Sequence, residues 1–162
     1  MNERAAAGDR LAPGAVIGIL GGGQLARMLS VAAARLGLRC HVYDPAPEPP
    51  AGDVAHRLTT AAFDDAAALA AFAEAVDVVT YEFENIPTAA LDLLERRRPI
   101  RPGRRALATS QDRVAEKTFL SEIGLRVAPW AAVSDRAGLD AALARIGAPA
   151  ILKTTRLGYD GK

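Results

Sequence analysis

The residues best suited to holding a ligand begin with a glycine turn near the N-terminus. Gly21, Gly23 and Ala26 fit the pattern G-x-G-x-x-G/A, placed after an apolar run and at the start of a helical pattern. Glycines let a backbone approach an anion closely, and the first N–H groups of a helix attract negative charge. Asp44 follows about 20 residues on, where a dinucleotide fold places its ribose-binding acid. Taken alone, the turn favours binding of NAD. The alternatives are that it binds the phosphate of another ligand, or that it is a tight turn that binds no ligand.

A second polar cluster lies in TYEFEN, residues 80–85, at the end of another apolar run. Open parallel sheets bind ligands at the carboxyl ends of their strands. In a continued strand Glu82 and Glu84 share one face, so they repel unless a hydroxyl, an amine or a cation lies between them. With Asn85 beside them, they predict a ligand site, and a solvated strand end is the alternative.

The third candidate is ILKTTRLGYDGK, residues 151–162. Lys153 lies in an otherwise apolar run, where a lone ammonium is costly to bury and a phosphate partner would offset that cost. The glycines of GYDGK supply backbone donors, and Lys162 adds charge. The stretch is typical of a strand that feeds a phosphate-holding loop, but it lacks the Walker pattern G-x-x-x-x-G-K-[ST].

Basic residues form two further groups. Arg113 and Lys117 are four residues apart, so on a helix they share a face that suits polyphosphate or is simply solvated. The densest basic run has no interleaved aromatic residues, which favours a solvated surface over nucleic-acid binding. That run comprises Arg96, Arg97, Arg98, Arg101, Arg104 and Arg105.

Composition narrows the class of protein. The chain has 162 residues, half of them hydrophobic, which suits one globular domain or one domain and part of another. A net charge of +1 provides no global attraction for nucleic acid or an anionic membrane. Cys40 is the only cysteine, which favours a reducing cytoplasm, and His41 and His56 lack metal-ligand spacing. No apolar run is long enough to span a membrane.

The periodicity predicts a parallel α/β sheet, because short apolar runs alternate with helical patterns. Strands are expected at 15–20, 39–44, 55–60, 76–83 and 99–102, with helices at 23–36, 64–75 and 88–97 and a proline-rich loop at 45–53. The first helix carries one apolar stripe, formed by Leu25, Met28, Leu29, Ala32 and Leu36.

The pattern changes after residue 102. Two consecutive helices are expected within 103–123, followed by a strand at 127–133, a helix at 135–147 and a strand at 148–155. The predicted organisation is a disordered lead (1–14), a complete α/β domain (15–102), a helical connector (103–123) and the truncated start of a second α/β domain (124–162).

Four motifs in this order, GILGGGQLARM, TYEFENIP, QDR-x-x-x-K and LKTTRLGYDGK, resemble the N5-carboxyaminoimidazole ribonucleotide synthetases, ATP-grasp ligases of purine biosynthesis. The resemblance covers residues 15–162. It implies a Rossmann-like preATP-grasp domain followed by the first elements of an ATP-grasp domain. In that family the glycine turn serves the aminoimidazole ribonucleotide, so the resemblance replaces NAD as the expected ligand.

The resemblance also implies roles for individual residues. Gly23, Gln24, Leu25 and Glu82 are expected to border the ribonucleotide site. The positions expected to contact ATP are Arg113, Lys153, Gly158, Tyr159, Asp160, Gly161 and Lys162.

The implied reaction is the ATP-driven carboxylation of 5-aminoimidazole ribonucleotide by bicarbonate, through carboxyphosphate, with Mg²⁺ on the polyphosphate. The magnesium ligands are expected beyond residue 162, so the isolated segment is not expected to turn over, and the complete enzyme is expected to be a homodimer. Two alternatives remain at this point: a stand-alone Rossmann-type NAD-binding module, and a short homologue that binds a partner without catalysis.

Overall fold

The structure is a computed structural model that describes residues 10–157, in two compact units, 1–107 and 108–162. Most of the expected disordered lead (residues 1–9) and the expected phosphate loop, Gly158 to Lys162, lie outside the described residues.

A four-stranded parallel sheet forms the centre of the first unit, in the order β3-β2-β1-β4. Its strands are β1 (Val16–Leu20), β2 (Arg39–Asp44), β3 (Arg57–Thr60) and β4 (Val78–Tyr81). The expected last strand at 99–102 is reduced to one parallel bridge between Val79 and Ile100. The predicted fold class, a parallel α/β sheet, is confirmed.

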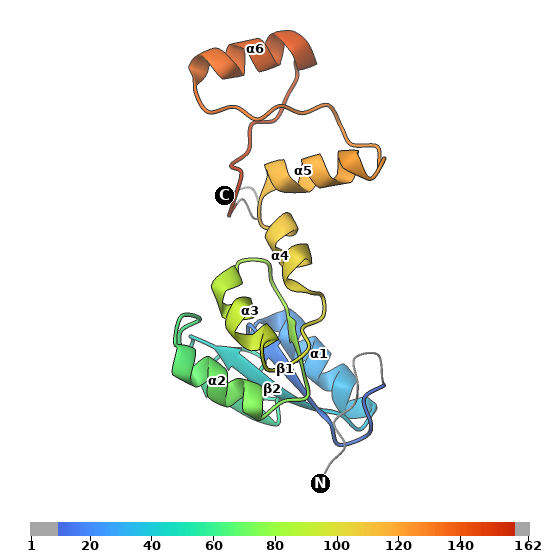
Figure 1. Ribbon diagram of the computed structural model, residues 1–162, viewed down its shortest axis with the longest axis vertical. Helices are drawn as coiled ribbons and strands as arrows, with labels where there is room; N and C mark the ends of the chain where they lie inside the picture. Colours follow the sequence, from blue (N-terminus) through green and yellow to red (C-terminus); the bar gives the residue numbers. More distant parts are fainter. Residues whose placement is uncertain (1–9, 158–162) are drawn as a thin grey trace. The chain divides into compact units, whose positions relative to one another are not determined.

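Helices cover both faces of this sheet, with α1 on one face and α2 and α3 on the other (Figure 1). Their bounds are α1 (Gln24–Arg35), α2 (Ala66–Glu74) and α3 (Thr88–Glu95). Asp65 begins α2, because its side chain accepts hydrogen bonds from the N–H groups of Ala67 and Ala68. Between α1 and the sheet the core is small, whereas between α2, α3 and the sheet it is large and includes Tyr43, Phe72 and Leu91.

The helix α1 packs on the sheet through small residues. Ala26, Ser30 and Ala33 are buried, and the Ser30 hydroxyl donates to the Ala26 carbonyl at 2.8 Å. The apolar stripe recognised in the sequence is therefore not the face that meets the sheet. Its four large members are all exposed: Leu25, Met28, Leu29 and Leu36.

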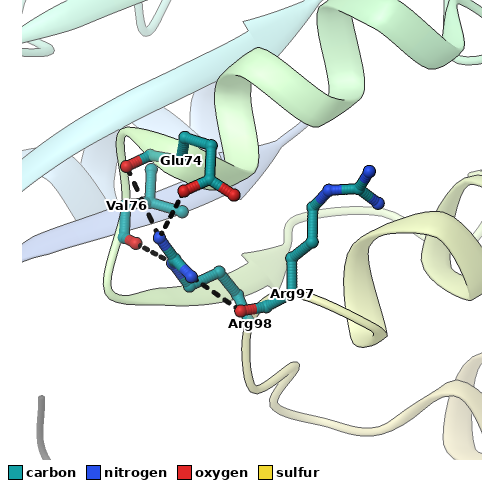
Figure 2. A network of polar contacts seen from close by, with 4 residues as sticks. All are labelled: Glu74, Val76, Arg97 and Arg98. Carbon is teal, nitrogen blue, oxygen red and sulfur yellow. Dashed lines mark hydrogen bonds and ion pairs between the residues drawn. The ribbon is translucent and has the colours of Figure 1, made fainter.

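The arginine cluster is not uniformly solvated, which corrects the expectation for one member. Arg98 is only 7% exposed, and its guanidinium lies against the end of α2 (Figure 2). Its Nε donates to the Val76 carbonyl at 2.6 Å, and one terminal nitrogen contacts the Glu74 carboxylate at 3.3 Å. Arg98 thus satisfies backbone acceptors where α2 ends, because a helix leaves its last carbonyls without intrahelical partners.

A buried histidine lies in the sheet itself. His41 on β2 is 2% exposed, and its Nε2 lies 2.8 Å from the Thr59 hydroxyl. Its Nδ1 is buried without a hydrogen-bond partner. The tautomer with the proton on Nε2 is favoured, because it leaves an acceptor unpaired instead of a buried N–H. Burial lowers the pKa of His41 from 6.5 to about 4, with Arg57 and His56 adding repulsion.

The second unit is built from helices. The helix α4 (Arg104–Ser110) runs across the division between the units, and α5 (Arg113–Glu122) and α6 (Arg136–Ile146) follow. Asp112 and Asp135 cap α5 and α6 through their side chains. The strands expected at 127–133 and 148–155 are absent from the described residues. A strand needs a hydrogen-bonded neighbour, and these segments have none there to pair with.

Replacing Arg98 by methionine should lower the free energy of unfolding by about 2–4 kcal/mol, because the stem is kept while the buried Val76 carbonyl and the part-buried carbonyls beside it lose their donor. Urea unfolding followed by circular dichroism measures this change. The control is Arg96→Met, at an exposed position in the same run, which should change stability by less than about 0.5 kcal/mol. Equal effects of the two substitutions would contradict the assignment.

The pKa of His41 predicts acid sensitivity of the fold. The unfolded chain takes up the proton near pH 6.5 and the folded chain only near pH 4. The uncharged, buried His41 therefore contributes about 3 kcal/mol to the free energy of unfolding. The contribution is complete above about pH 6.5 and is lost as the pH falls toward 4. Urea unfolding between pH 7 and 4 should show this loss in the wild type and much less of it in His41→Gln. His56→Gln, at an exposed histidine, should retain most of it, because burial is the largest cause of the lowered His41 pKa and His56 is the smallest.

Candidate functional site

The glycine turn lies between β1 and α1, at the carboxyl edge of the sheet. Gly21 has a φ of +92°, a conformation that favours glycine, and its N–H donates to the Tyr43 carbonyl at 2.9 Å. A Cβ on Gly21 would lie 2.6 Å from Cγ of Glu82. The turn therefore depends on glycine both for its backbone angle and for the close approach of the chain that follows β4.

The Glu82 carboxylate occupies the N-terminal end of α1. Its Oε1 accepts from the N–H of Gly23 at 3.0 Å, and its Oε2 accepts from the N–H of Ala26 at 3.2 Å. These are donors that would hold a phosphate in a dinucleotide-binding turn. The anion at this helix end is a side chain of the protein itself, so the phosphate-holding interpretation of the turn is wrong for these N–H groups.

Asp44 is engaged in a similar way. Its Oδ2 accepts from the N–H of Gly22 and its Oδ1 accepts from the N–H of Ala46, both at 2.7 Å. The Gly22 carbonyl in turn accepts from the N–H of Ala51 at 2.8 Å. Asp44 therefore joins the end of β2, the glycine turn and the proline-rich loop, and it is not an acid standing free to bind a ribose.

A shallow open depression of about 280 Å³ lies over this turn. The depression is lined by Gly22, Gly23, Asp44, Ala46, Glu48, Pro49, Pro50, Glu82 and Phe83. Its charged side chains are all carboxylates, and its walls are formed by prolines and one aromatic ring. Carboxylate oxygens only accept hydrogen bonds, so the depression suits a ligand that presents amines or hydroxyls more than one that presents phosphate.

Only some of the residues predicted to bind the substrate line the depression. Gly23 and Glu82 line it, whereas Gln24 and Leu25 begin α1 and are exposed outside its lining. Glu84 is exposed and does not line it either, because the chain leaves β4 after Tyr81 and strand alternation no longer applies.

Sequence reasoning missed the contribution of the proline-rich loop. Pro49 packs so closely on the turn that a Cβ on Gly22 would lie 2.5 Å from it. The run PAPEPPAGD predicted an exposed extended loop, but its prolines also signal a rigid segment that keeps a fixed position. With Glu48, this loop supplies one wall of the depression.

The described ATP candidates belong to the second unit. The N–H of Arg113, at the start of α5, donates to the Thr155 carbonyl at 2.9 Å. Arg156 donates to the Gln111 side chain at 2.9 Å. These bonds bring the segment that follows Lys153 to the beginning of α5. Lys153 is exposed outside any strand, so the argument from burial in an apolar strand does not hold for it.

Among residues 10–157, no three His, Cys, Asp or Glu side chains form a group that could hold a metal ion. No helix within this described range is long and apolar enough to cross a membrane.

The fold and the site agree with the protein family that comparison with known domains identifies. The ribonucleotide synthetase preATP-grasp domain matches residues 15–111, and an ATP-grasp domain matches residues 118–162. The chain belongs to the ribonucleotide synthetase preATP-grasp family, and its second part is the start of an ATP-grasp domain. The stand-alone NAD-binding module is thereby excluded.

Named relatives are N5-carboxyaminoimidazole ribonucleotide synthases. The one from Brucella melitensis is 52% identical over 94% of this chain, and this chain covers 42% of it. The structure from Staphylococcus aureus complexed with ADP has a TM-score of 0.89 at 41% identity, covering 94% of this chain and 41% of that one.

A third relative, from Aspergillus clavatus, was solved with ADP and 5-aminoimidazole ribonucleotide. It has a TM-score of 0.79 at 31% identity and covers 88% of this chain and 39% of that one. The chain thus spans about two fifths of the length of these relatives.

Replacing Gly23 by alanine should displace Glu82, because the new Cβ would lie 2.7 Å from Oε1 of that side chain. The two N–H bonds at the end of α1 would be lost, lowering the free energy of unfolding by about 1–3 kcal/mol. Gly103→Ala is the control, since a Cβ there meets nothing within 4 Å. Urea unfolding that shows equal stabilities for the two variants would refute the role given to Glu82.

Proposed function

We propose that this chain forms the ribonucleotide-binding part of an ATP-grasp ligase that carboxylates 5-aminoimidazole ribonucleotide with bicarbonate to N5-carboxyaminoimidazole ribonucleotide. Family membership and the names of the relatives support the reaction class. The observation that carries the proposal is the Glu82 carboxylate at the end of α1. This carboxylate lies where a dinucleotide-binding turn would hold a phosphate, and with Asp44 and Glu48 it gives the depression a lining rich in hydrogen-bond acceptors.

The chemistry of the substrate fits this depression. 5-Aminoimidazole ribonucleotide carries an exocyclic amine and ribose hydroxyls, all of which donate hydrogen bonds. Glu82 accepts two backbone N–H bonds and keeps further lone pairs, because a carboxylate offers about four acceptor sites. In this proposal Glu82 and Gly23 contact the substrate, and Gln24 and Leu25 border it from the first turn of α1.

ATP is assigned to the second unit. Arg113, Lys153 and the loop from Gly158 to Lys162 are proposed to hold its phosphates, in a protein as long as the relatives. Carboxyphosphate chemistry needs a positioned, charge-neutralised polyphosphate, which Mg²⁺ supplies when bound. The magnesium ligands are assigned, as the family resemblance implies, to the part of an ATP-grasp domain that lies beyond residue 162 in proteins as long as the relatives.

Three further assignments accompany this proposal. Bicarbonate is the carboxyl donor, the complete enzyme is a homodimer, and the reaction takes place in the cytoplasm. The lone cysteine supports the last of these, because Cys40 is a free thiol with no second cysteine in the sequence to pair with.

A short homologue that binds a partner without catalysis is the second candidate. Its support is that segments 127–133 and 148–155 form no strand among the described residues of the second unit. Reading the gene beyond Lys162 separates the two: an in-frame continuation with acidic metal ligands supports the ligase, and a stop codon supports the short homologue.

Glu82→Gln should weaken binding of 5-aminoimidazole ribonucleotide about tenfold, because it replaces an acceptor oxygen with a donor. Isothermal calorimetry measures the affinity, and circular dichroism of the same samples checks that each variant is folded. Glu84→Gln is the matched control, because it changes an exposed carboxylate outside the depression and should bind as the wild type does.

NADH titrated into the same samples tests whether the glycine turn binds a dinucleotide instead of the ribonucleotide. Binding of NADH with no binding of the ribonucleotide would overturn the proposal. Equal ribonucleotide affinity of the Glu82 and Glu84 variants would remove Glu82 from the site.

A further inference from the structure

The proline-rich loop that walls the depression can form few hydrogen bonds of its own. Four of the six residues 45–50 are proline, which has no N–H, so most of this segment cannot donate to a neighbour. The N–H groups of Ala46 and Ala51 donate out of the loop, to β2 and to the glycine turn. Between these two anchors, Glu48 and Pro50 are exposed. The outer part of the wall therefore depends on donors from other segments.

Arg27 on α1 supplies such a donor. Its Nη1 donates to the Pro50 carbonyl at 2.9 Å and forms a 2.6 Å ion pair with the Asp53 carboxylate. A single nitrogen therefore contacts the loop on both sides of Ala51. The side chains of Arg27 and Asp53 are 39% and 74% exposed, so the ion pair alone is weak. The bond to the Pro50 carbonyl makes it an attachment at two points.

The turn of α1 that bears Arg27 also holds Glu82. The N–H of Arg27 donates to the Gly23 carbonyl at 3.0 Å, which closes the first turn of the helix. The N–H groups of Gly23 and Ala26 in that turn bind the Glu82 carboxylate. One helical turn therefore carries Glu82 directly and, through the Arg27 side chain, the loop that bears Glu48. Both of these carboxylates line the depression.

We propose that Arg27 is a positioning residue for the ribonucleotide site, which holds Glu48 and the proline-rich loop at a fixed separation from Glu82. Arg27 does not line the depression, so it acts through the loop and not on the ligand. A ligand that contacts both walls binds best when both are already in place, because less ordering is then needed on binding. The identity of the ligand rests on the proposed function, whereas the effect of Arg27 on the loop does not.

Amide hydrogen exchange tests the effect on the loop without any ligand. Arg27→Met keeps the stem of the side chain and removes its donors. Exchange at the Ala51 N–H should become at least about fivefold faster, because its bond to the Gly22 carbonyl breaks whenever the loop leaves the turn. Arg35→Met is the matched control, because it removes an exposed arginine from the last turn of the same helix. Equal exchange rates at Ala51 in the two variants would overturn the proposal.

Calorimetry with 5-aminoimidazole ribonucleotide tests the effect on binding. Arg27→Met should raise the dissociation constant at least about threefold, and Arg35→Met should bind as the wild type does. Arg27→Lys should stay within about twofold of the wild type, because one ammonium can make both contacts that Nη1 makes. A residue that only stabilised the fold would leave the affinity of the folded molecules unchanged. A lysine variant as weak as the methionine variant would contradict the proposal.

Asp53→Asn separates positioning from direct contact with the ligand. In this proposal the loss of the ion pair weakens the attachment of the loop, so Asp53→Asn should lower the affinity. The double variant should bind no more weakly than Arg27→Met alone, because both substitutions act on one attachment. If Arg27 instead contacted the phosphate of the ligand, removal of the competing Asp53 carboxylate would leave the affinity equal or higher. That result would overturn the proposal.

Failure of the positioning role and failure of the proposed function give different results. A wild type that does not bind the ribonucleotide overturns the proposed function, and exchange at Ala51 then still decides whether Arg27 holds the loop. A wild type that binds, with equal affinities of Arg27→Met and Arg35→Met, overturns the positioning role and leaves the proposed function standing.

Discussion

The first N–H groups of α1 have no partners within the helix, and the Glu82 carboxylate satisfies two of them. This interaction connects the chain after β4 to the start of α1, across 59 residues of sequence. It acts together with the packing of Ala26 and Ala33 against the sheet, which leaves the larger residues of α1 facing outward. Both the character of the depression and the exposure of the apolar stripe depend on it.

Electrostatics distinguish this turn from one that binds a dinucleotide. A glycine turn at a helix start attracts whatever negative charge can reach it, and here two protein carboxylates are already in place. The turn and its acids together become a surface of hydrogen-bond acceptors. In the proposed function, the amine and hydroxyls of a ribonucleotide are complementary to such a surface, and its phosphate is held by other groups.

The two units differ in how far their polar groups find hydrogen-bond partners and their apolar side chains are buried. In the first unit, strands pair in a continuous parallel sheet, and the buried side chains of Arg98 and Tyr43 donate to the carbonyls of Val76 and Ala62. In the second unit, apolar side chains such as Ile151 and Leu152 are mostly exposed. Helices form in the second unit because their backbone hydrogen bonds join residues close in sequence, whereas a strand forms only when a second strand pairs with it.

By itself the sequence determined what depends on local pattern: the order of helices and strands through residue 95, the glycine turn and the family motifs. It also placed Glu82 at the ligand edge. Tertiary structure alone decided which face of α1 is buried, that Arg98 is internal, and that Glu82 and Asp44 bind the turn's N–H groups. These outcomes depend on which segments meet across the fold, and contacts between distant residues leave no periodic signal in the sequence.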